Sequence, residues 1–334
     1  MIDRRTLLGG LAAGWLCPMP AWAAPQHRGV ALGLFASDPD WNYVALLDEL
    51  RAMNAAQVLL VAPYYQDSVT CSTIGRRSGF SPSPRTVERT LAQARRRGFA
   101  VSLMPLVRLT RRTATEWRGV LQPRDVQAWF AAWSQIVWTM AELAAEYDAH
   151  RLIVGTEFAS LESHVVPWSQ LITGVRARFS GRLMYSANWD HYRQVPFWSL
   201  VDDVGITGYF RLCMPGIQPV SSEITAGWRQ RFTTLDAFAA SHNRPWMLTE
   251  VGWPALATAA AYPWDDTRDA PPDTALQARL WSAFLDAVQA HPQPPAFFAW
   301  NGFGPVSETD HGFGLRGRPA GRVVAERFAR WASR

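Results

Sequence analysis

The stretch PWMLTEVGWP, residues 245–254, joins a short apolar run to one carboxylate, Glu250, which stands where the run ends. The run reads as a buried strand, because proline precedes it and glycine and proline follow it. A carboxylate at the mouth of such a strand is costly to bury unless it is paired or used. The stretch therefore raises the question of whether another strand of the chain ends in the same way.

Strands of this kind alternate with longer amphipathic segments along most of the chain. We predict eight strands, at residues 30–35, 58–63, 100–107, 152–155, 183–186, 204–207, 246–249 and 296–299. We predict helices at residues 43–53, 86–97, 126–147, 168–179, 226–240, 274–290 and 320–331, with Asp125 and Asp273 as caps. The connection near residues 195–200 is too short for a full helix.

This alternation within 334 residues predicts an α/β fold, a single (β/α)8 TIM barrel. A doubly wound open sheet is the competing fold. It commonly carries a G-x-G-x-x-G turn after the first strand, which is missing here.

The composition excludes several classes of function. All 33 basic residues are arginine, so no lysine is available for a Schiff base, for pyridoxal chemistry or for a P-loop. The net charge of +5 is modest, and no basic stripe or nucleic-acid motif accompanies it, so we expect no nucleic-acid partner. The count of 17 tryptophans is high. Many must lie in the core, but flat aromatic faces also stack on sugar rings, so the excess weakly favours a carbohydrate partner.

The N-terminus has the features of a targeting segment. Arg4-Arg5 precede an apolar stretch at residues 7–17, and Ala21-Trp22-Ala23 forms a small-x-small cleavage site. The paired arginines resemble a twin-arginine export signal, with a general secretory signal as the alternative. We therefore predict an export signal at residues 1–23, one catalytic domain at residues 24–334, and a periplasmic or secreted protein. No later apolar run is long enough to span a membrane.

Cysteine and histidine give no sign of a metal site. Cys71 and Cys213 remain after the predicted cleavage, and they form either a disulfide or two buried free thiols. No histidine belongs to an H-x-H or H-E-x-x-H arrangement, and no cluster has metal-ligand spacing. We expect neither a metal nor another cofactor.

In a (β/α)8 barrel, functional side chains gather at the carboxyl ends of the strands. Glu157 follows the fourth predicted strand and Glu250 ends the seventh, so the two stand across the barrel mouth from each other. The neighbouring strand ends carry aromatic and amide groups, namely Asn188 and Trp189 after the fifth strand, Tyr209 after the sixth and Trp300 after the eighth.

Two carboxyl groups in this arrangement suit the cleavage of a glycosidic bond. One protonates the leaving oxygen and the other meets the oxocarbenium-like carbon. At a separation of roughly 5 to 5.5 Å the second carboxylate attacks directly, and the stereochemistry is retained by double displacement. A single glutamate at one strand end would more often be a salt-bridged structural carboxylate, but the pair favours catalysis.

The chain also resembles glycoside hydrolase clan A, most closely the family 113 β-mannanase type. The matching segments run in order from about residue 64 to residue 320 and include YYQDSVTCSTI, EWRGVLQPRDVQAWFAAW, IVGTEFASLE, YSANWDHYRQVPFWSLVDDVGITGYF, PWMLTEVGW and GFGLRGRPA. Each segment is of middling specificity, but together they cover most of the chain.

The resemblance implies a role for each residue at the barrel mouth. Glu157 would be the acid/base and Glu250 the nucleophile, with Tyr209 as a hydrogen-bond donor to the nucleophile. Trp300 would form the floor of the subsite for the attacked sugar, and the further cleft residues would be Asn188, Trp189 and Trp117. Three other carboxylates, Glu162, Asp202 and Asp203, are expected at the surface or at helix starts.

The chain departs from the clan pattern at two places. Thr156 precedes the acid/base where clan members commonly have asparagine, and Met104-Pro105-Leu106 replaces a polar Lys-Pro-His-like stretch after the third strand. The predicted function is that of a retaining glycoside hydrolase acting on a β-linked polysaccharide, endo-β-1,4-mannanase-like, without a cofactor. The alternative is a catalytically silent carbohydrate-binding barrel that serves exopolysaccharide or cell-surface glycan assembly.

Overall fold

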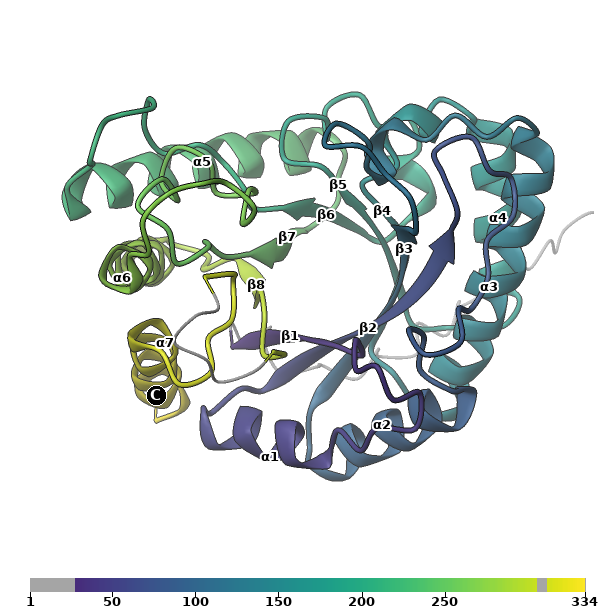
Figure 1. Cartoon of the computed structure of the whole chain (residues 1–334), viewed down its shortest axis with the longest axis horizontal. Coiled ribbons are helices and arrows are strands. Elements are labelled where there is room, and N and C mark those ends of the chain that lie inside the picture. Colours follow the sequence, from purple (N-terminus) through teal and green to yellow (C-terminus); the bar gives the residue numbers. More distant parts are fainter. Residues whose placement is uncertain (1–27, 305–310, 334) are drawn as a thin grey trace, which may run out of the picture.

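The protein is a closed barrel of eight parallel strands surrounded by helices (Figure 1). The computed structural model describes residues 28–304 and 311–333, so the predicted export signal lies outside the described residues. The strands follow one another around the barrel in chain order, and β1 pairs with β8 to close it. The predicted single (β/α)8 TIM barrel is therefore confirmed.

The eight predicted strands are all present. They are β1 Gly29–Gly33, β2 Gln57–Gln66, β3 Ala100–Leu109, β4 Arg151–Thr156, β5 Arg182–Ala187, β6 Asp203–Thr207, β7 Trp246–Val251 and β8 Ala296–Ala299. The strands β2 and β3 extend beyond their predicted ends because they pair with each other over ten residues.

Seven α-helices lie in the described residues, close to the predicted positions. They are α1 Val44–Ala52, α2 Pro84–Arg96, α3 Val126–Glu146, α4 Val165–Arg176, α5 Ser221–Ser241, α6 Thr274–Ala290 and α7 Pro319–Ala332. Both predicted caps are confirmed: Asp125 accepts a hydrogen bond from the backbone N–H of Ala128, and Asp273 accepts one from Leu276.

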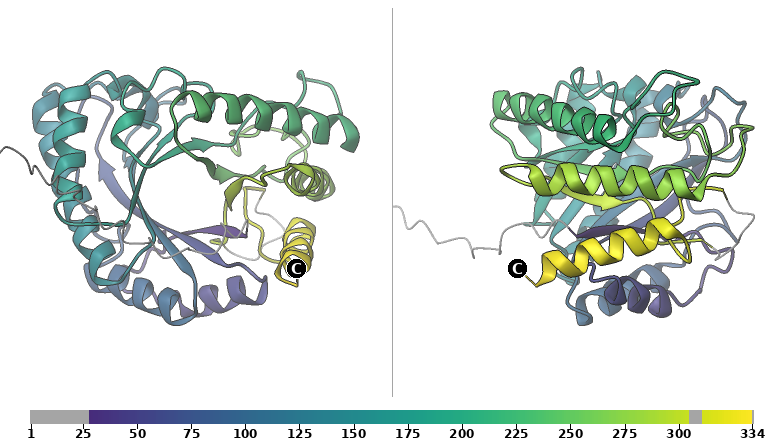
Figure 2. Two further views of the ribbon diagram at one scale, coloured as in Figure 1. Left: turned by 180° about the vertical axis from the view of Figure 1, so that it is seen from behind. Right: turned by 90° about the vertical axis from the view of Figure 1, so that its left-hand side faces the viewer.

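The connection between β5 and β6 holds only a short 3-10 helix, Trp198–Leu200, as its length predicted. Fully buried aromatic rings take the place of the missing helix: Phe197 and Trp198 both pack against Tyr185 of β5. Farther along the chain, α5, α6 and α7 lie side by side (Figure 2). The ring of Phe238, in α5, packs against Trp198 of this connection.

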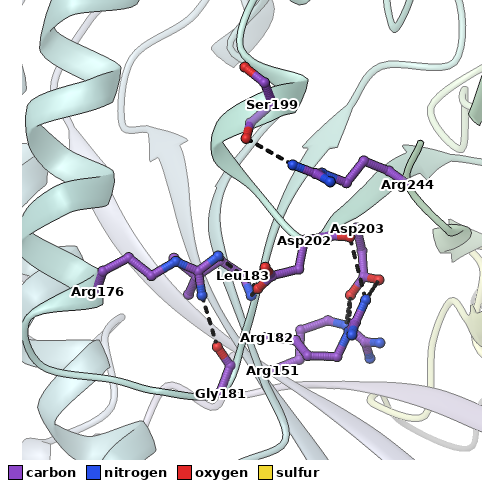
Figure 3. A network of polar contacts seen from close by, with 9 residues as sticks. All are labelled: Arg151, Arg176, Gly181, Arg182, Leu183, Ser199, Asp202, Asp203 and Arg244. Atoms are coloured by element: carbon purple, nitrogen blue, oxygen red, sulfur yellow. Dashed lines mark hydrogen bonds and ion pairs between the residues drawn. The ribbon is translucent and has the colours of Figure 1, made fainter. Parts of the chain in front are cut away.

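The amino ends of β4, β5 and β6 are joined by a buried ion-pair network (Figure 3). Asp203 is paired with both Arg151 and Arg182, and Asp202 accepts the backbone N–H of Leu183. Burial raises the pKa of Asp203, but the two arginines outweigh burial and hold it below its usual value. The expectation that Asp203 is a surface or helix-start carboxylate is therefore wrong, because this carboxylate joins three strands inside the barrel bottom.

Two further expectations concern cysteines and membrane spans. Cys71 and Cys213 are both free thiols, and each is half-buried rather than buried. Within residues 28–304 and 311–333, none of the helices combines the length and the apolar character that crossing a membrane requires.

Candidate active site

Glu157 and Glu250 stand at the carboxyl ends of β4 and β7, as predicted. Irregularities in strand pairing lie beside both: the register of β4 against β5 shifts between Ile153 and Thr156, and that of β7 against β8 between Leu248 and Val251. Such bulges redirect side chains next to barrel mouths. Both glutamates are buried.

The backbone of Glu157 adopts a conformation that residues other than glycine seldom take. Its φ of 55° lies in the left-handed region. Its backbone N–H donates to the carbonyl oxygen of Ser186 at 2.8 Å, which ties it to β5. Its Oε2 lies 3.3 Å from Nη2 of Arg118, in the loop between β3 and α3. Backbone outliers of this kind cluster at functional sites.

Glu250 has one satisfied and one unsatisfied carboxylate oxygen. The hydroxyl of Tyr209 donates to Oε2 at 2.9 Å, which is the bond expected for this tyrosine. Oε1 is buried and accepts no hydrogen bond from any described residue. Burial, with the nearby charge of Glu157, raises the pKa of Glu250 to about 7, against the lowering effects of Arg118 and Tyr209. A buried acceptor without a donor is costly in a purely structural carboxylate.

A chain of buried hydroxyls connects the strands that carry the two glutamates. The Thr156 hydroxyl donates to Ser186 Oγ at 3.2 Å, and Ser186 Oγ lies 2.6 Å from Thr249 Oγ1. Thr156 and Thr249 directly precede the two glutamates, so the chain links the backbones that carry them. In the sequence, the trace of this contact is the Thr-Glu pair that occurs at both strand ends, but the pair alone does not predict that the two threonines are linked. Thr156, a departure from the clan pattern, thus has a structural role here.

Trp300 lies at the end of β8, half-buried, beside the apolar interior of the barrel. Its backbone N–H donates to Val251 at 2.7 Å, and its carbonyl leaves no room for a side chain at Gly252, where a Cβ would lie 2.4 Å away. Phe35 packs against the same interior cluster. Trp300 therefore lies beside the apolar interior of the barrel, at the carboxyl end of β8.

Trp189 and Asn188, after β5, contact a neighbouring ring, a carboxylate and the end of β6. The Trp189 ring stacks on Trp264 with centroids 5.4 Å apart, and one carboxylate, Asp190, accepts the amide of Asn188 at 2.7 Å. Asn188 Oδ1 also accepts the hydroxyl of Thr207, at the end of β6. Among the described residues, neither side chain forms a hydrogen bond or an ion pair with the glutamates.

Trp117 is half-buried and packs beside Gly119, where a Cβ would lie 2.3 Å from the indole. The polar contact with Glu157 in this loop comes instead from the next residue, Arg118. Arg118 was not among the predicted site residues, because no strand end or spacing marks a residue of an irregular loop.

Glu162 forms a second buried carboxylate near the end of β4, so the expectation that it lies at the surface is wrong. It accepts the hydroxyl of Tyr185 at 2.7 Å and lies 2.6 Å from Nδ1 of His191. The Tyr185 oxygen in turn accepts the backbone N–H of Phe158, the residue after Glu157. Burial raises the pKa of Glu162, although both partners lower it. This network holds the segment that follows Glu157 against β5.

The end of β3 presents apolar rather than polar groups to the barrel interior. Met104 and Leu106 are buried in the same cluster as Ile153 and Met184. The first charged side chain on the strand is the exposed Arg108, whose guanidinium lies over the ring of Phe35 at 5.4 Å. The Met104-Pro105-Leu106 stretch thus contributes apolar side chains to the barrel interior.

Among residues 28–304 and 311–333, no group of three or more histidine, cysteine or acidic side chains is arranged to hold a metal ion.

Comparison with solved structures shows the same fold in glycoside hydrolases. A family 113 β-mannanase from Alicyclobacillus acidocaldarius, in complex with ManMIm, has a TM-score of 0.78 at 23% identity, with 91% of this chain and 97% of that chain covered. Another family 113 β-1,4-mannanase has a TM-score of 0.79 at 17% identity, with 91% and 99% covered. A GH5_18 enzyme from Streptomyces cattleya, in complex with GlcNAc, has a TM-score of 0.58 at 16% identity, with 93% and 82% covered.

Sequence comparison gives the family directly. No curated protein matches the chain at a significant level. The family model for Glycoside Hydrolase Family 113, however, matches residues 30–307, which is most of the barrel and includes both glutamates. The chain is therefore a glycoside hydrolase and belongs to family 113.

Proposed function

We propose that the protein is a retaining endo-β-1,4-mannanase-like enzyme in which Glu250 attacks carbon and Glu157 moves the proton. The observation that carries this proposal is the pair of buried glutamates at the carboxyl ends of β4 and β7. One of them, Glu250, keeps a buried oxygen without a hydrogen-bond donor among the described residues. A buried acceptor without a donor costs folding stability, so its presence in this site favours a role in binding or catalysis.

The first step would form a glycosyl-enzyme. Glu250 in its ionised form attacks the anomeric carbon, and the glycosidic C–O bond breaks as the leaving oxygen takes the proton of Glu157. In the second step Glu157 accepts a proton from water, whose oxygen displaces Glu250 from the same carbon. The Tyr209 hydroxyl, 2.9 Å from Oε2, holds the Glu250 carboxylate in one orientation throughout.

Mannan is the leading substrate in this proposal, because two of the similar structures, with TM-scores of 0.78 and 0.79, are family 113 β-mannanases. A bacterial exopolysaccharide or cell-surface glycan is next, since the apolar end of β3 alters the surroundings of the site. The test is a screen of the purified protein on β-mannan, β-glucans, β-galactans and bacterial exopolysaccharides, with product sizes resolved. Cleavage of mannan to oligosaccharides supports the proposal. No cleavage of any β-glycan by the folded protein favours the silent binding barrel.

Replacing Trp300 tests the predicted sugar platform. We expect Trp300→Ala to lower kcat/KM roughly thirtyfold, because an aromatic face against a sugar ring contributes about 2 kcal/mol. The ring is only half-buried, so the melting temperature should fall little. The matched control is Trp281→Ala, which removes a fully buried indole and should lower the melting temperature while activity per folded molecule is unchanged. Unchanged activity with a sharply lower melting temperature for Trp300→Ala would make this ring part of the core.

We also propose export by the twin-arginine route, which rests on Arg4-Arg5 and the small-x-small site. Replacement of both arginines by lysine should stop export, because the twin-arginine system requires the pair whereas a general secretory signal needs only positive charge. Fractionation of cells that express the full chain measures the amount in the periplasm. Normal periplasmic levels of the double variant would assign the general secretory route instead.

A further inference from the structure

One cation, Arg118, contacts Glu157 from a loop outside the strand ends. Arg118 begins a 3-10 helix, Arg118–Val120, in the loop between β3 and α3. The loop is fixed directly after this helix, because the hydroxyl of Ser160 donates to the carbonyl of Leu121 at 2.7 Å. Ser160 lies in the 3-10 helix Ala159–Leu161, which begins two residues after Glu157. The segments that carry Arg118 and Glu157 are thus fastened together.

The contact between Arg118 and Glu157 is incomplete for a structural ion pair. One distance, Nη2 to Oε2, is 3.3 Å, and the side chains are only 21% and 7% exposed. The Arg118 Nε is buried and donates to no described residue. A structural arginine–carboxylate pair commonly forms two parallel hydrogen bonds, so this guanidinium keeps donor capacity within the site.

The charge of Arg118 also acts on the second glutamate. The charged and titratable groups that bear on Glu250 are Glu157 from β4, Arg118 from its loop and Tyr209 from the end of β6. Burial and Glu157 raise the pKa of Glu250, whereas Arg118 and the Tyr209 hydrogen bond lower it. Arg118 has the same direction of effect on Tyr209, whose pKa burial and the two glutamates raise well above its usual value. Among these groups, Arg118 carries the positive charge.

We propose that Arg118 is a positioning residue of the reaction centre, which orients Glu157 and supplies the positive charge that keeps Glu250 ionised. This inference rests on the proposed retaining function, in which Glu250 must be without its proton to attack carbon. Without Arg118, Glu250 would hold its proton to higher pH, and the fraction of enzyme ready to attack at neutral pH would fall.

The test compares pH profiles of kcat/KM for wild type, Arg118→Gln and Arg118→Lys on the best substrate from the screen. The acid limb, set by ionisation of Glu250, should move up by about one pH unit in Arg118→Gln. At pH values below the acid limb, kcat/KM should then be about tenfold lower than in wild type, and at higher pH the loss should be smaller. Arg118→Lys should restore the limb, since it keeps the charge. The matched control is Arg124→Gln, which removes an exposed arginine later in the same loop and should leave the limb in place.

A second measurement does not depend on turnover. The ionisation of Glu250 is followed without substrate by infrared difference spectra between each protein and its Glu250→Gln counterpart over a range of pH. A higher midpoint in Arg118→Gln than in wild type supports the inference, even if no substrate is cleaved and the proposed function fails. Equal midpoints in folded proteins would overturn it, and so would a loss of kcat/KM of the same size at every pH.

Discussion

Glu250→Ala is expected to lose at least roughly four orders of magnitude in kcat/KM on any substrate that the wild type cleaves. The reason is that no glycosyl-enzyme can form without the attacking carboxylate, and covalent catalysis accounts for much of the large rate acceleration by such enzymes. Glu250 is 2% exposed, and burial raises its pKa, which means that its charge is unfavourable in the folded protein. Removing this side chain should therefore leave the fold intact. Rates on β-linked substrates and thermal unfolding measure the two effects separately.

Azide identifies the vacated position in this variant. The anion can enter only from the face that Glu250 occupied, and it displaces the leaving group once with inversion, so a β-glycoside should give the α-glycosyl azide. The matched control is Glu146→Ala, which removes an exposed carboxylate from the outer helix α3 and should keep wild-type activity. A Glu250→Ala protein that is folded and retains wild-type turnover would show that Glu250 is not the nucleophile.

Glu157→Ala is expected to fail in a different way. A natural substrate needs a proton on its leaving oxygen, so we expect kcat/KM to fall roughly 100-fold to 10,000-fold, the usual contribution of general acid–base catalysis. An aryl glycoside with a good leaving group needs no such proton and should still form the glycosyl-enzyme. The intermediate then accumulates, because no base activates water.

Azide should restore turnover of that aryl glycoside by Glu157→Ala, because it attacks the intermediate without a base. Two inversions then give the β-glycosyl azide. The α-azide from Glu157→Ala together with the β-azide from Glu250→Ala would mean that the two assignments are exchanged. The aryl glycoside must first be shown to be a wild-type substrate.

The fold could be predicted from the sequence because each strand is a short apolar run bounded by turn residues. The positions of Glu157 and Glu250 followed from that pattern, since every residue directly after such a run lies at one end of the barrel. The hydrogen bond of Tyr209 to Glu250 was also anticipated, although through family resemblance rather than from the residue pattern.

The parts that could not be predicted depend on loops and on contacts between strands. Arg118 comes from an irregular loop, whose path no periodicity determines. Glu162 and Asp203 were expected at the surface, because polarity alone does not reveal a buried partner such as Tyr185 or Arg151. Trp117 and Trp189 show the same limit: the family resemblance implies a place in the cleft for both, but only the structure shows which groups they pack against.

The proposed mechanism requires Glu157 and Glu250 to cleave a β-glycosidic bond together, by double displacement. The most direct test is the anomeric configuration of the product that forms first, followed by proton NMR during cleavage of a β-1,4-linked mannooligosaccharide by the wild-type protein. We predict that the β-anomer appears first and that the α-anomer follows only by mutarotation. Initial release of the α-anomer would contradict the mechanism, because it would mean a single displacement by water and no covalent role for Glu250.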